Sequence, residues 1–321
     1  MESGAGEKLQ AITGIPYYYR QFGYEMGISF GGGRIGYQPQ IPKLKEDEQE
    51  PFIIRSAEEG DIDFILDLYE HASGRYLLSC QRDEAIWRYE LSGMSEKNIN
   101  RSEIRLIETV AGEKVGYLAH NSFIWGPHMA ATAYEVKPGI SWGVVTPSVI
   151  RYLIHTGEQY AARDEDGPAC SGFGFWGGIQ HPVYDVLADK LPRVRKPYAW
   201  FVRLPDIPDF VQHIALALEK RLANSPFSGH TGELKLTFYR RGLKMTFEYG
   251  RLNETAAWEP TPHGHSGDAA FPDLTFLQLL FGYRSLDELD NAFADCWRND
   301  EATGLLNMLF PKKPSNIWPV D

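Results

Sequence analysis

Residues 52–69, with the sequence FIIRSAEEGDIDFILDLY, combine a short apolar run with the spacing of an amphipathic helix. The run at residues 52–55 carries aromatic and β-branched side chains and predicts a strand. Ser56 and Glu59 have the spacing of a capping box, which predicts a helix start. The apolar residues that follow recur at helical intervals: Ile62, Ile65, Leu66 and Tyr69. A strand that leads directly into such a helix predicts a unit in which helices pack on a sheet.

Downstream of this segment, strand and helix patterns continue to alternate. Residues 105–120 predict a hairpin, and Pro147 suits the first turn of a helix and predicts a helix start there. The remaining patterns predict strands at residues 132–136, 173–176 and 198–204, and a helix at residues 181–191. This order indicates an α/β or α+β layer domain.

Upstream of residue 52, the sequence changes to glycine, proline and charge. Three glycines at residues 31–33 are followed by Pro39, Pro42 and the charged residues 43–50, so this stretch is interpreted as a loop or linker. The preceding part is too short to bury a core unaided and must pack on other residues.

Beyond residue 205, a second set of elements is predicted. A helical stripe covers residues 210–218, and two alternating runs on either side of residues 240–242 predict a hairpin. Ser285 and Glu288 form a capping box for a helix whose buried face includes Leu286, Leu289, Phe293 and Trp297. The final segment, residues 310–321, has no periodicity, so the tail is either frayed or held in a groove, and Phe310, Ile317 and Trp318 favour a held tail.

The composition is that of a folded, acidic protein. Of 321 residues, 43% are hydrophobic, which excludes wholesale disorder. Lys and Arg total 32 against 43 Asp and Glu, a net charge of −11, which disfavours binding to nucleic acid or anionic membranes and favours cationic substrates. Three widely spaced cysteines, no signal peptide and no membrane-length apolar run predict a soluble protein of the cytoplasm.

Residues 16–25, PYYYRQFGYE, form the most informative stretch. They predict a helical turn that ends at Gly23 and leads into a strand. A tyrosine on such a turn either packs as a core aromatic or donates a proton from a pocket. The segment resembles the Y-x-x-x-G-[FY] signature that closes the catalytic core of the GNAT superfamily of N-acetyltransferases, with Tyr19, Gly23 and Tyr24 at the defined positions.

The resemblance extends over most of the chain by order of elements. Residues 52–69 look like the first strand and helix of a second GNAT unit, and the last third looks like a sterol-carrier-protein-like domain. The combination is similar to the C-terminal part of the enhanced intracellular survival protein family. It implies an α+β fold with terminal elements of a first GNAT unit plus a linker at residues 1–50, a degenerate second GNAT-like domain at 51–205, and a sterol-carrier-like domain at 206–321.

The resemblance also implies a reaction and its residues. Acetyl-CoA would be the acetyl donor, and a small-molecule amine or a lysine-containing substrate would be the acceptor. Tyr19 matches the general acid, Asp321 supplies the terminal carboxylate expected to act as base, and Tyr18, Arg20 and Phe22 are expected beside the cofactor. Tyr18 replaces Tyr19 as the acid if the register shifts by one residue.

One part of the superfamily pattern has no match in the sequence. The R/Q-x-x-G-x-G/A turn that grips the pyrophosphate should precede residue 16, and the second unit has no equivalent around Trp142. The chain is therefore interpreted as an N-acetyltransferase-type protein without its N-terminal cofactor-binding segment. The alternative is a non-catalytic ligand-binding or oligomerisation module, and the family implies a homo-oligomer in either case. No metal site is expected, because His263 and His265 lie in a solvated loop.

Overall fold

The computed structural model describes residues 6–15, 17–124, 126–163, 167–261 and 266–318. Contacts divide the chain into two compact units. The two-sheet unit joins the residues up to Ile28 to Ala199–Lys313, and the seven-stranded unit joins Ser29–Tyr198 to the residues from Pro314 onward. Each unit thus combines segments that are far apart in the sequence.

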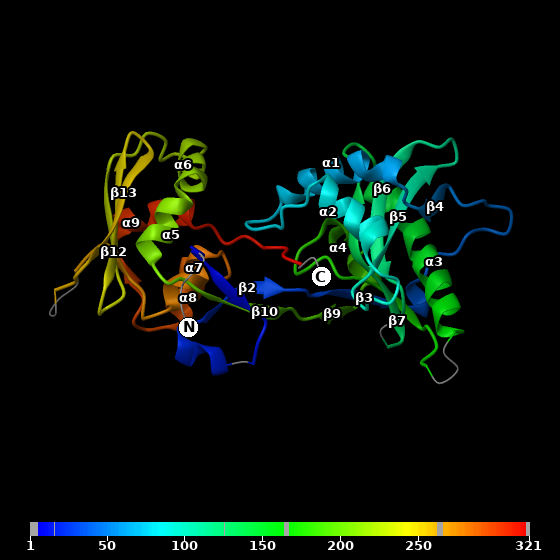
Figure 1. Ribbon diagram of the computed structural model, residues 1–321, viewed down its shortest axis with the longest axis horizontal. Coiled ribbons are helices and arrows are strands. Elements are labelled where there is room, and N and C mark those ends of the chain that lie inside the picture. The colour runs from blue at the N-terminus through cyan, green and yellow to red at the C-terminus, as the bar shows by residue number, and fades with distance from the viewer. Residues whose placement is uncertain (1–5, 16, 125, 164–166, 262–265, 319–321) are drawn as a thin grey trace. The chain divides into compact units, whose positions relative to one another are not determined.

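The seven-stranded unit is built on one mixed sheet with the strand order β4-β5-β6-β7-β8-β3-β9 (Figure 1). Among the described strands of this sheet, β7 and β8 pair in parallel and the other neighbours pair antiparallel. The strands are β3 (Gly33–Tyr37), β4 (Phe52–Ser56), β5 (Ser102–Thr109), β6 (Lys114–Asn121), β7 (His128–Val136), β8 (Gly172–Phe175) and β9 (Arg193–Arg195).

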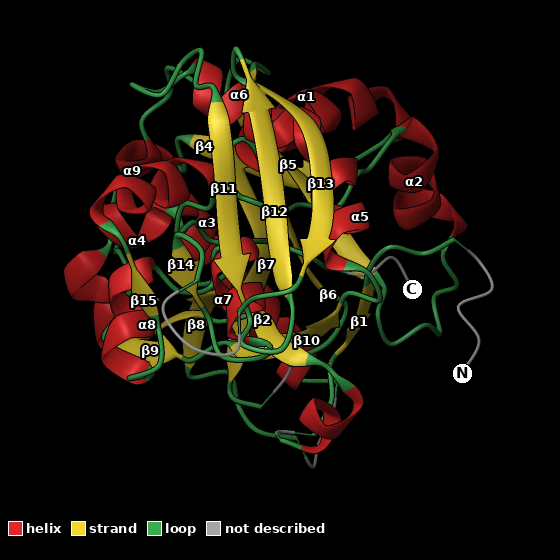
Figure 2. Ribbon diagram, turned by 90° about the vertical axis from the view of Figure 1, so that its left-hand side faces the viewer, coloured by secondary structure: helices red, strands yellow, loops and turns green. Residues whose placement is uncertain are grey.

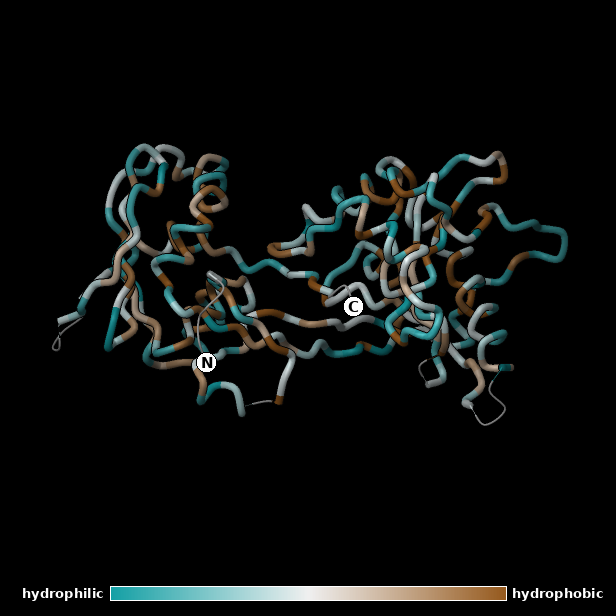
Figure 3. The backbone as a smooth tube through the Cα atoms, in the orientation of Figure 1, coloured by the Kyte–Doolittle hydropathy of each residue, from teal (hydrophilic) through white to brown (hydrophobic). Residues whose placement is uncertain are grey.

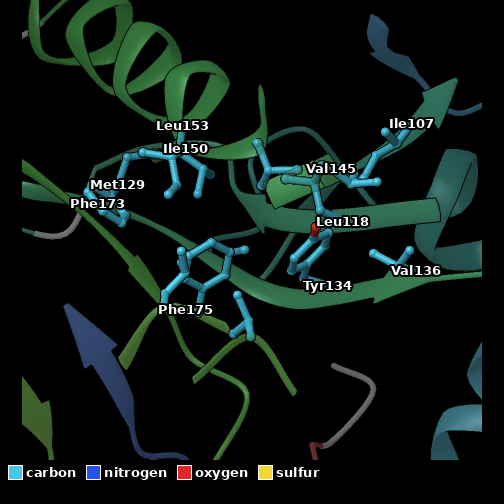
Figure 4. Close-up of a cluster of buried hydrophobic side chains, with 14 of the residues drawn as sticks. Ile107, Leu118, Met129, Tyr134, Val136, Val145, Ile150, Leu153, Phe173 and Phe175 are labelled. Atoms are coloured by element: carbon cyan, nitrogen blue, oxygen red, sulfur yellow. The ribbon is translucent and has the colours of Figure 1, made fainter. Parts of the chain in front are cut away.

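Helices cover both faces of this sheet. Neighbouring strand residues such as Leu106 and Ile107 belong to different core clusters, because successive side chains of a strand point to opposite faces. The first cluster lies under α3 (Trp142–Ala161), as Figure 4 shows, and the second lies under α1 (Ile62–Ser73) and α2 (Glu84–Arg88). A shorter helix, α4 (Pro182–Val186), follows β8. The predicted layered unit is confirmed.

The glycine-rich segment interpreted as a linker is partly a strand, so that interpretation is wrong for residues 33–37. These residues form β3, between β8 and β9. Gly36 allows the close approach, since a Cβ there would lie 2.6 Å from the carbonyl oxygen of Lys190. Residues 43–50 remain a hydrophilic loop, as Figure 3 shows beside β4.

Two predicted helix starts in this unit are wrong. Glu58 caps a short 3₁₀ turn, Glu59–Asp61, that precedes α1, so Ser56 and Glu59 do not form the box. Helix α3 begins at Trp142, and Pro147 lies inside it. The helix tolerates this proline because the carbonyl that loses its partner belongs to Gly143, an exposed residue.

The two-sheet unit contains a small sheet with the order β1-β10-β2 and a larger one with the order β13-β12-β11-β14-β15. The small sheet consists of β1 (Gln10–Ile12), β2 (Glu25–Phe30) and β10 (Tyr198–Arg203). Figure 2 shows β11, β12 and β13 side by side, and β11–β12 is the predicted hairpin. The larger sheet consists of β11 (Gly232–Thr237), β12 (Gly242–Glu248), β13 (Arg251–Trp258), β14 (Ala269–Ala270) and β15 (Trp297–Arg298).

The helices of the two-sheet unit are α5 (Ile207–His213), α6 (Ala215–Ala223), α7 (Thr275–Leu280), α8 (Leu286–Ala292) and α9 (Asp300–Leu309). The capping box of Ser285 and Glu288 at the start of α8 is confirmed. The predicted buried face is too long, because α8 ends at Ala292 and Trp297 belongs to β15.

The fold as a whole is of the α+β class, as predicted. The two compact units group the chain differently from the predicted segments 1–50, 51–205 and 206–321, because strand pairing draws residues 33–37 into the seven-stranded sheet. The assignment of those three segments to family domains stays a prediction. Within the described residues, none of the helices is both long enough and apolar enough to cross a bilayer.

Candidate functional site

The tyrosine-rich segment forms the turn that the sequence predicts. Residues Tyr18–Phe22 make one 3₁₀ helix, and Gly23 ends it in the left-handed conformation, with φ of 81°. The amide nitrogens of Gly23 and Tyr24 donate to the carbonyl oxygens of Arg20 and Tyr19, at 3.0 and 3.2 Å. A glycine is favoured at such a position because it has no Cβ to clash. Strand β2 begins at Glu25, so the turn leads into a strand, as predicted.

Tyr19 is held in place by the packing of its ring. The ring centroid lies 5.3 Å from that of Tyr18 and 6.1 Å from those of Tyr24 and Phe201. It also lies against Gly14, where an added Cβ would come within 1.9 Å of the Tyr19 ring. The ring is half-buried, so its position is fixed while part of the side chain remains accessible.

The residues predicted to contact the cofactor lie around Tyr19 on the same turn. Tyr18 and Phe22 are 50% and 46% exposed. The Arg20 guanidinium forms an ion pair with Glu25, with 2.6 Å between Nη2 and Oε2. Glu25 is buried and also accepts a hydrogen bond from Gln278 Nε2 at 3.1 Å. The turn therefore presents two exposed aromatic side chains beside a cation that is anchored by a buried carboxylate.

Asp321, the predicted base, lies outside the described residues. The described tail ends at Trp318 and runs beside residues 77–80 of the seven-stranded unit. Ser79 and Asn316 form a parallel bridge, Leu77 N donates to the carbonyl of Pro314 at 2.7 Å, and the thiol of Cys80 donates to the carbonyl of Trp318 at 2.9 Å. The prediction that the tail is held, rather than frayed, is confirmed for these residues.

A pocket of about 300 Å³ lies in the seven-stranded unit, next to this tail. Its floor is formed by β5, β6 and β7, and its sides by α1, α2 and the segment that follows α2. Asn316 and Trp318 complete the wall, and the Trp318 ring packs on Phe30 with centroids 5.1 Å apart. No pattern in the sequence predicts this pocket.

An ion pair and aromatic rings shape the pocket. Arg82 pairs with Glu90, and both side chains are nearly buried, at 10% and 14% exposure. The guanidinium carbon lies 5.5 Å from the Trp87 ring and 5.9 Å from the Tyr69 ring, in cation–π geometry. Burial opposes the charge of Arg82, but the Glu90 carboxylate outweighs it, so the pKa of Arg82 is raised. For Tyr69, in contrast, burial itself raises the pKa, and the hydroxyl donates to the carbonyl of Cys80 at 2.7 Å.

The pocket residues give little signal in the sequence. Arg82, Trp87 and Glu90 come from one short segment, but charged residues at this spacing are also typical of solvent-exposed helices. Their partners Tyr69 and Tyr117 lie on other elements. Only the three-dimensional fold brings them together. The clue that could have been used is a pair of opposite charges eight residues apart on either side of a tryptophan.

The described ranges hold no group of three or more histidine, cysteine, aspartate or glutamate side chains placed to bind a metal ion. His263 and His265 lie outside these ranges.

No protein-family model matches this sequence, and no curated protein matches it. The fold, in contrast, matches solved structures over nearly the whole chain. A GCN5-related N-acetyltransferase from Anabaena variabilis has a TM-score of 0.57 and 12% identity, over 97% of this chain and 72% of that chain. One from Kribbella flavida has a TM-score of 0.57 and 16% identity, over 98% of this chain and 71% of that chain.

Eis1 from Mycobacterium abscessus is also similar, with a TM-score of 0.51 and 13% identity, over 98% of this chain and 73% of that chain. The chain therefore has the fold of these GCN5-related N-acetyltransferases and of Eis1, which confirms the resemblance drawn from the sequence. At these identities the likeness is one of fold.

Proposed function

We propose that the protein is an N-acetyltransferase that transfers the acetyl group of acetyl-CoA to an amine. The observation that carries the proposal is the placement of Tyr19. It lies on a turn of defined shape, with its ring fixed by Gly14 and Phe201, in a chain with the fold of GCN5-related N-acetyltransferases. A fixed phenol that stays partly accessible is suited to proton donation.

The residues around Tyr19 are compatible with a bound coenzyme. Tyr18, Arg20 and Phe22 are all exposed, so each can contact it, and Arg20 keeps N–H groups beyond the one that meets Glu25. Acetyl-CoA, when bound, supplies an acetyl group activated as a thioester. Tyr18 and Phe22 would hold its apolar part and Arg20 its phosphates.

Two proton transfers complete the proposed mechanism. Tyr19 Oη donates its proton to the departing sulfur, and a carboxylate of Asp321 accepts a proton from the substrate ammonium. The net charge of −11 favours a cationic acceptor, such as a polyamine or a lysine-containing peptide. We also propose that the protein forms a homo-oligomer and acts in the cytoplasm. Its three cysteines are free, which suits a reducing compartment.

Thiol release from acetyl-CoA, measured with a chromogenic thiol reagent and a panel of amines, tests the proposal. The Tyr19→Phe variant removes only the hydroxyl, and we expect it to lower kcat by about 100-fold, the usual contribution of a general acid. Tyr24→Phe is the matched control, because Tyr24 directly follows Gly23 and its hydroxyl donates to Gln10 Oε1 at 3.2 Å.

The outcomes are distinct. Loss of turnover in Tyr19→Phe with near-normal turnover in Tyr24→Phe supports Tyr19 as the acid. Equal turnover in the wild type and Tyr19→Phe would remove Tyr19 from the mechanism. Absence of thiol release with every amine, together with no calorimetric heat on addition of millimolar acetyl-CoA, would leave the second candidate function, ligand binding without catalysis. The pocket of the seven-stranded unit favours that second candidate.

A further inference from the structure

The pocket of the seven-stranded unit has the features of a small-molecule site. Its volume of about 300 Å³ is at the lower end of the range for ligand pockets. Its residues come from the sheet, two helices and the tail, all within one compact unit. It shares no residue with the turn of Tyr19, so its ligand need not be the substrate of the proposed reaction.

The charges of the pocket cancel. Arg82 and Glu90 are its only charged lining residues among the described part of the chain, and they pair with each other. Both side chains are nearly buried, so a ligand charge would have to enter a poorly hydrated space without a free counter-charge. Burial of an uncompensated charge is costly. The pocket therefore favours an uncharged ligand.

The walls supply flat apolar surfaces and hydrogen-bonding groups together. Tyr69, Trp87 and Tyr117 offer aromatic rings, with Trp87 edge-on to both neighbours at centroid distances of 5.5 and 5.9 Å. Asn100 and Asn121 add amide groups, which both donate and accept. Aromatic walls select a ring, and amide groups select an edge that carries a donor and an acceptor.

One polar atom of the wall has no partner. Trp87 is 4% exposed, and its Nε1 forms no hydrogen bond with any described residue. Buried donors of this kind are rare, because an unmade hydrogen bond costs about 1–3 kcal/mol. A bound molecule that places an acceptor at this atom would supply the missing partner.

We propose that this pocket binds an uncharged aromatic or heteroaromatic ring that carries an amide-like edge. The ring packs against the wall formed by the Tyr69, Trp87 and Tyr117 side chains, and the edge meets the asparagine amides. The inference goes beyond acetyl transfer and holds whether or not Tyr19 is catalytic.

Three probes of one shape and different charge test the inference: benzamide, benzoate and benzylammonium. Binding to the full chain is measured by saturation-transfer NMR. Location is measured by mass spectrometry of cysteine alkylation, because Cys80 lines the pocket and Cys296, in the other unit, provides an internal control. We expect benzamide to bind about tenfold more tightly than either charged probe and to slow alkylation of Cys80 alone.

A pocket-filling variant provides the second arm. Ala133→Phe places a ring in the pocket and should abolish benzamide binding, whereas Ala217→Phe, at an exposed position of α6, should leave it unchanged. If Ala133→Phe does not fold, the comparison of the three probes and the protection of Cys80 in the wild type test the inference without the variant. Tighter binding of a charged probe, undiminished binding in folded Ala133→Phe, or no protection of Cys80 by millimolar benzamide would each overturn the inference.

Discussion

The turn of Tyr19 and the pocket of the seven-stranded unit both contain several aromatic side chains, but these side chains differ in how far they are buried. On the turn, Tyr18 and Phe22 are 50% and 46% exposed, and Tyr19 is only half-buried. In the pocket, Trp87 and Tyr117 are 4% and 1% exposed. The turn can therefore change its surface residues at little cost to stability, whereas the pocket residues are also part of the core.

The largest expected difference between the two regions concerns their aromatic side chains. Trp87→Ala removes a buried ring that contacts Tyr69 and Tyr117, and we expect it to lower the free energy of unfolding by about 4 kcal/mol. Tyr18→Ala should cost less than about 1 kcal/mol, because half of that side chain is already in water. Urea unfolding of both variants measures the difference, and equal losses would contradict the comparison.

The next difference concerns the two arginine–glutamate pairs. Arg82→Ala leaves the nearly buried Glu90 without its partner and should cost about 3 kcal/mol. Arg20→Ala should cost about 1 kcal/mol, because the Arg20 side chain is 40% exposed and the buried Glu25 carboxylate keeps hydrogen bonds from Gln278 Nε2 and the Met26 amide. Urea unfolding curves of the two variants measure which substitution lowers the free energy of unfolding more. A larger loss in Arg20→Ala would show that the turn depends on its ion pair more than the pocket does.

Acid should act on the seven-stranded unit through His120. Its Nδ1 meets the carbonyl of Asn121 at 2.8 Å and its Nε2 the hydroxyl of Tyr152 at 2.9 Å, and the ring is fully buried. Burial lowers the pKa of His120 to about 4 from its ordinary value of 6.5, an effect that the nearby charge of Arg105 reinforces.

The sign of the effect follows from proton binding. Between these two pKa values the unfolded chain binds the proton and the folded chain does not, so stability is lost as the pH falls. The loss is about 2 kcal/mol between about pH 7 and about pH 5. Unfolding curves of the wild type and His120→Gln at both pH values measure it. An unchanged pH dependence in His120→Gln would exclude this histidine as the cause.

The smallest expected effect on stability is that of Gly14→Ala, at about 1 kcal/mol or less. The new methyl group would lie 1.9 Å from the present position of the Tyr19 ring, so the ring must move. If Tyr19 is the acid, acetyl transfer should fall by tenfold or more, since about 1 Å of misplacement can cost that much. Near-ultraviolet circular dichroism and the thiol-release assay check both effects, and full activity with a displaced ring would count against Tyr19.

How much the sequence could predict depends on whether a signal is local. The strand and helix of residues 52–69 follow from local periodicity, although the predicted cap at Ser56 is wrong, and the turn at Gly23 follows from the glycine itself. The strand at residues 33–37 could not be predicted in this way, because its glycines are typical of loops. Their role becomes clear only when β8 and β9 lie on either side.

The candidate site divides in the same way. The segment around Tyr19 is contiguous and carries a recognisable pattern, so its turn was predicted and is confirmed. The pocket depends on the short segment of Arg82, Trp87 and Glu90 meeting Tyr69 on α1 and Tyr117 on β6. Pairing between distant segments leaves no mark on the local sequence, so the pocket could only be found in three dimensions.

The position of β3 between β8 and β9 has a consequence for folding. Both partners of this strand come far later in the sequence. Closing the sheet therefore costs a large amount of chain entropy before the pairings with β8 and β9 can stabilise it. Until then the two edges of β3 lack partners from this sheet. The last pairings of the sheet are therefore expected to form slowly, and pulse-labelling hydrogen exchange during refolding should show protection of the β4–β7 amides before those of β3.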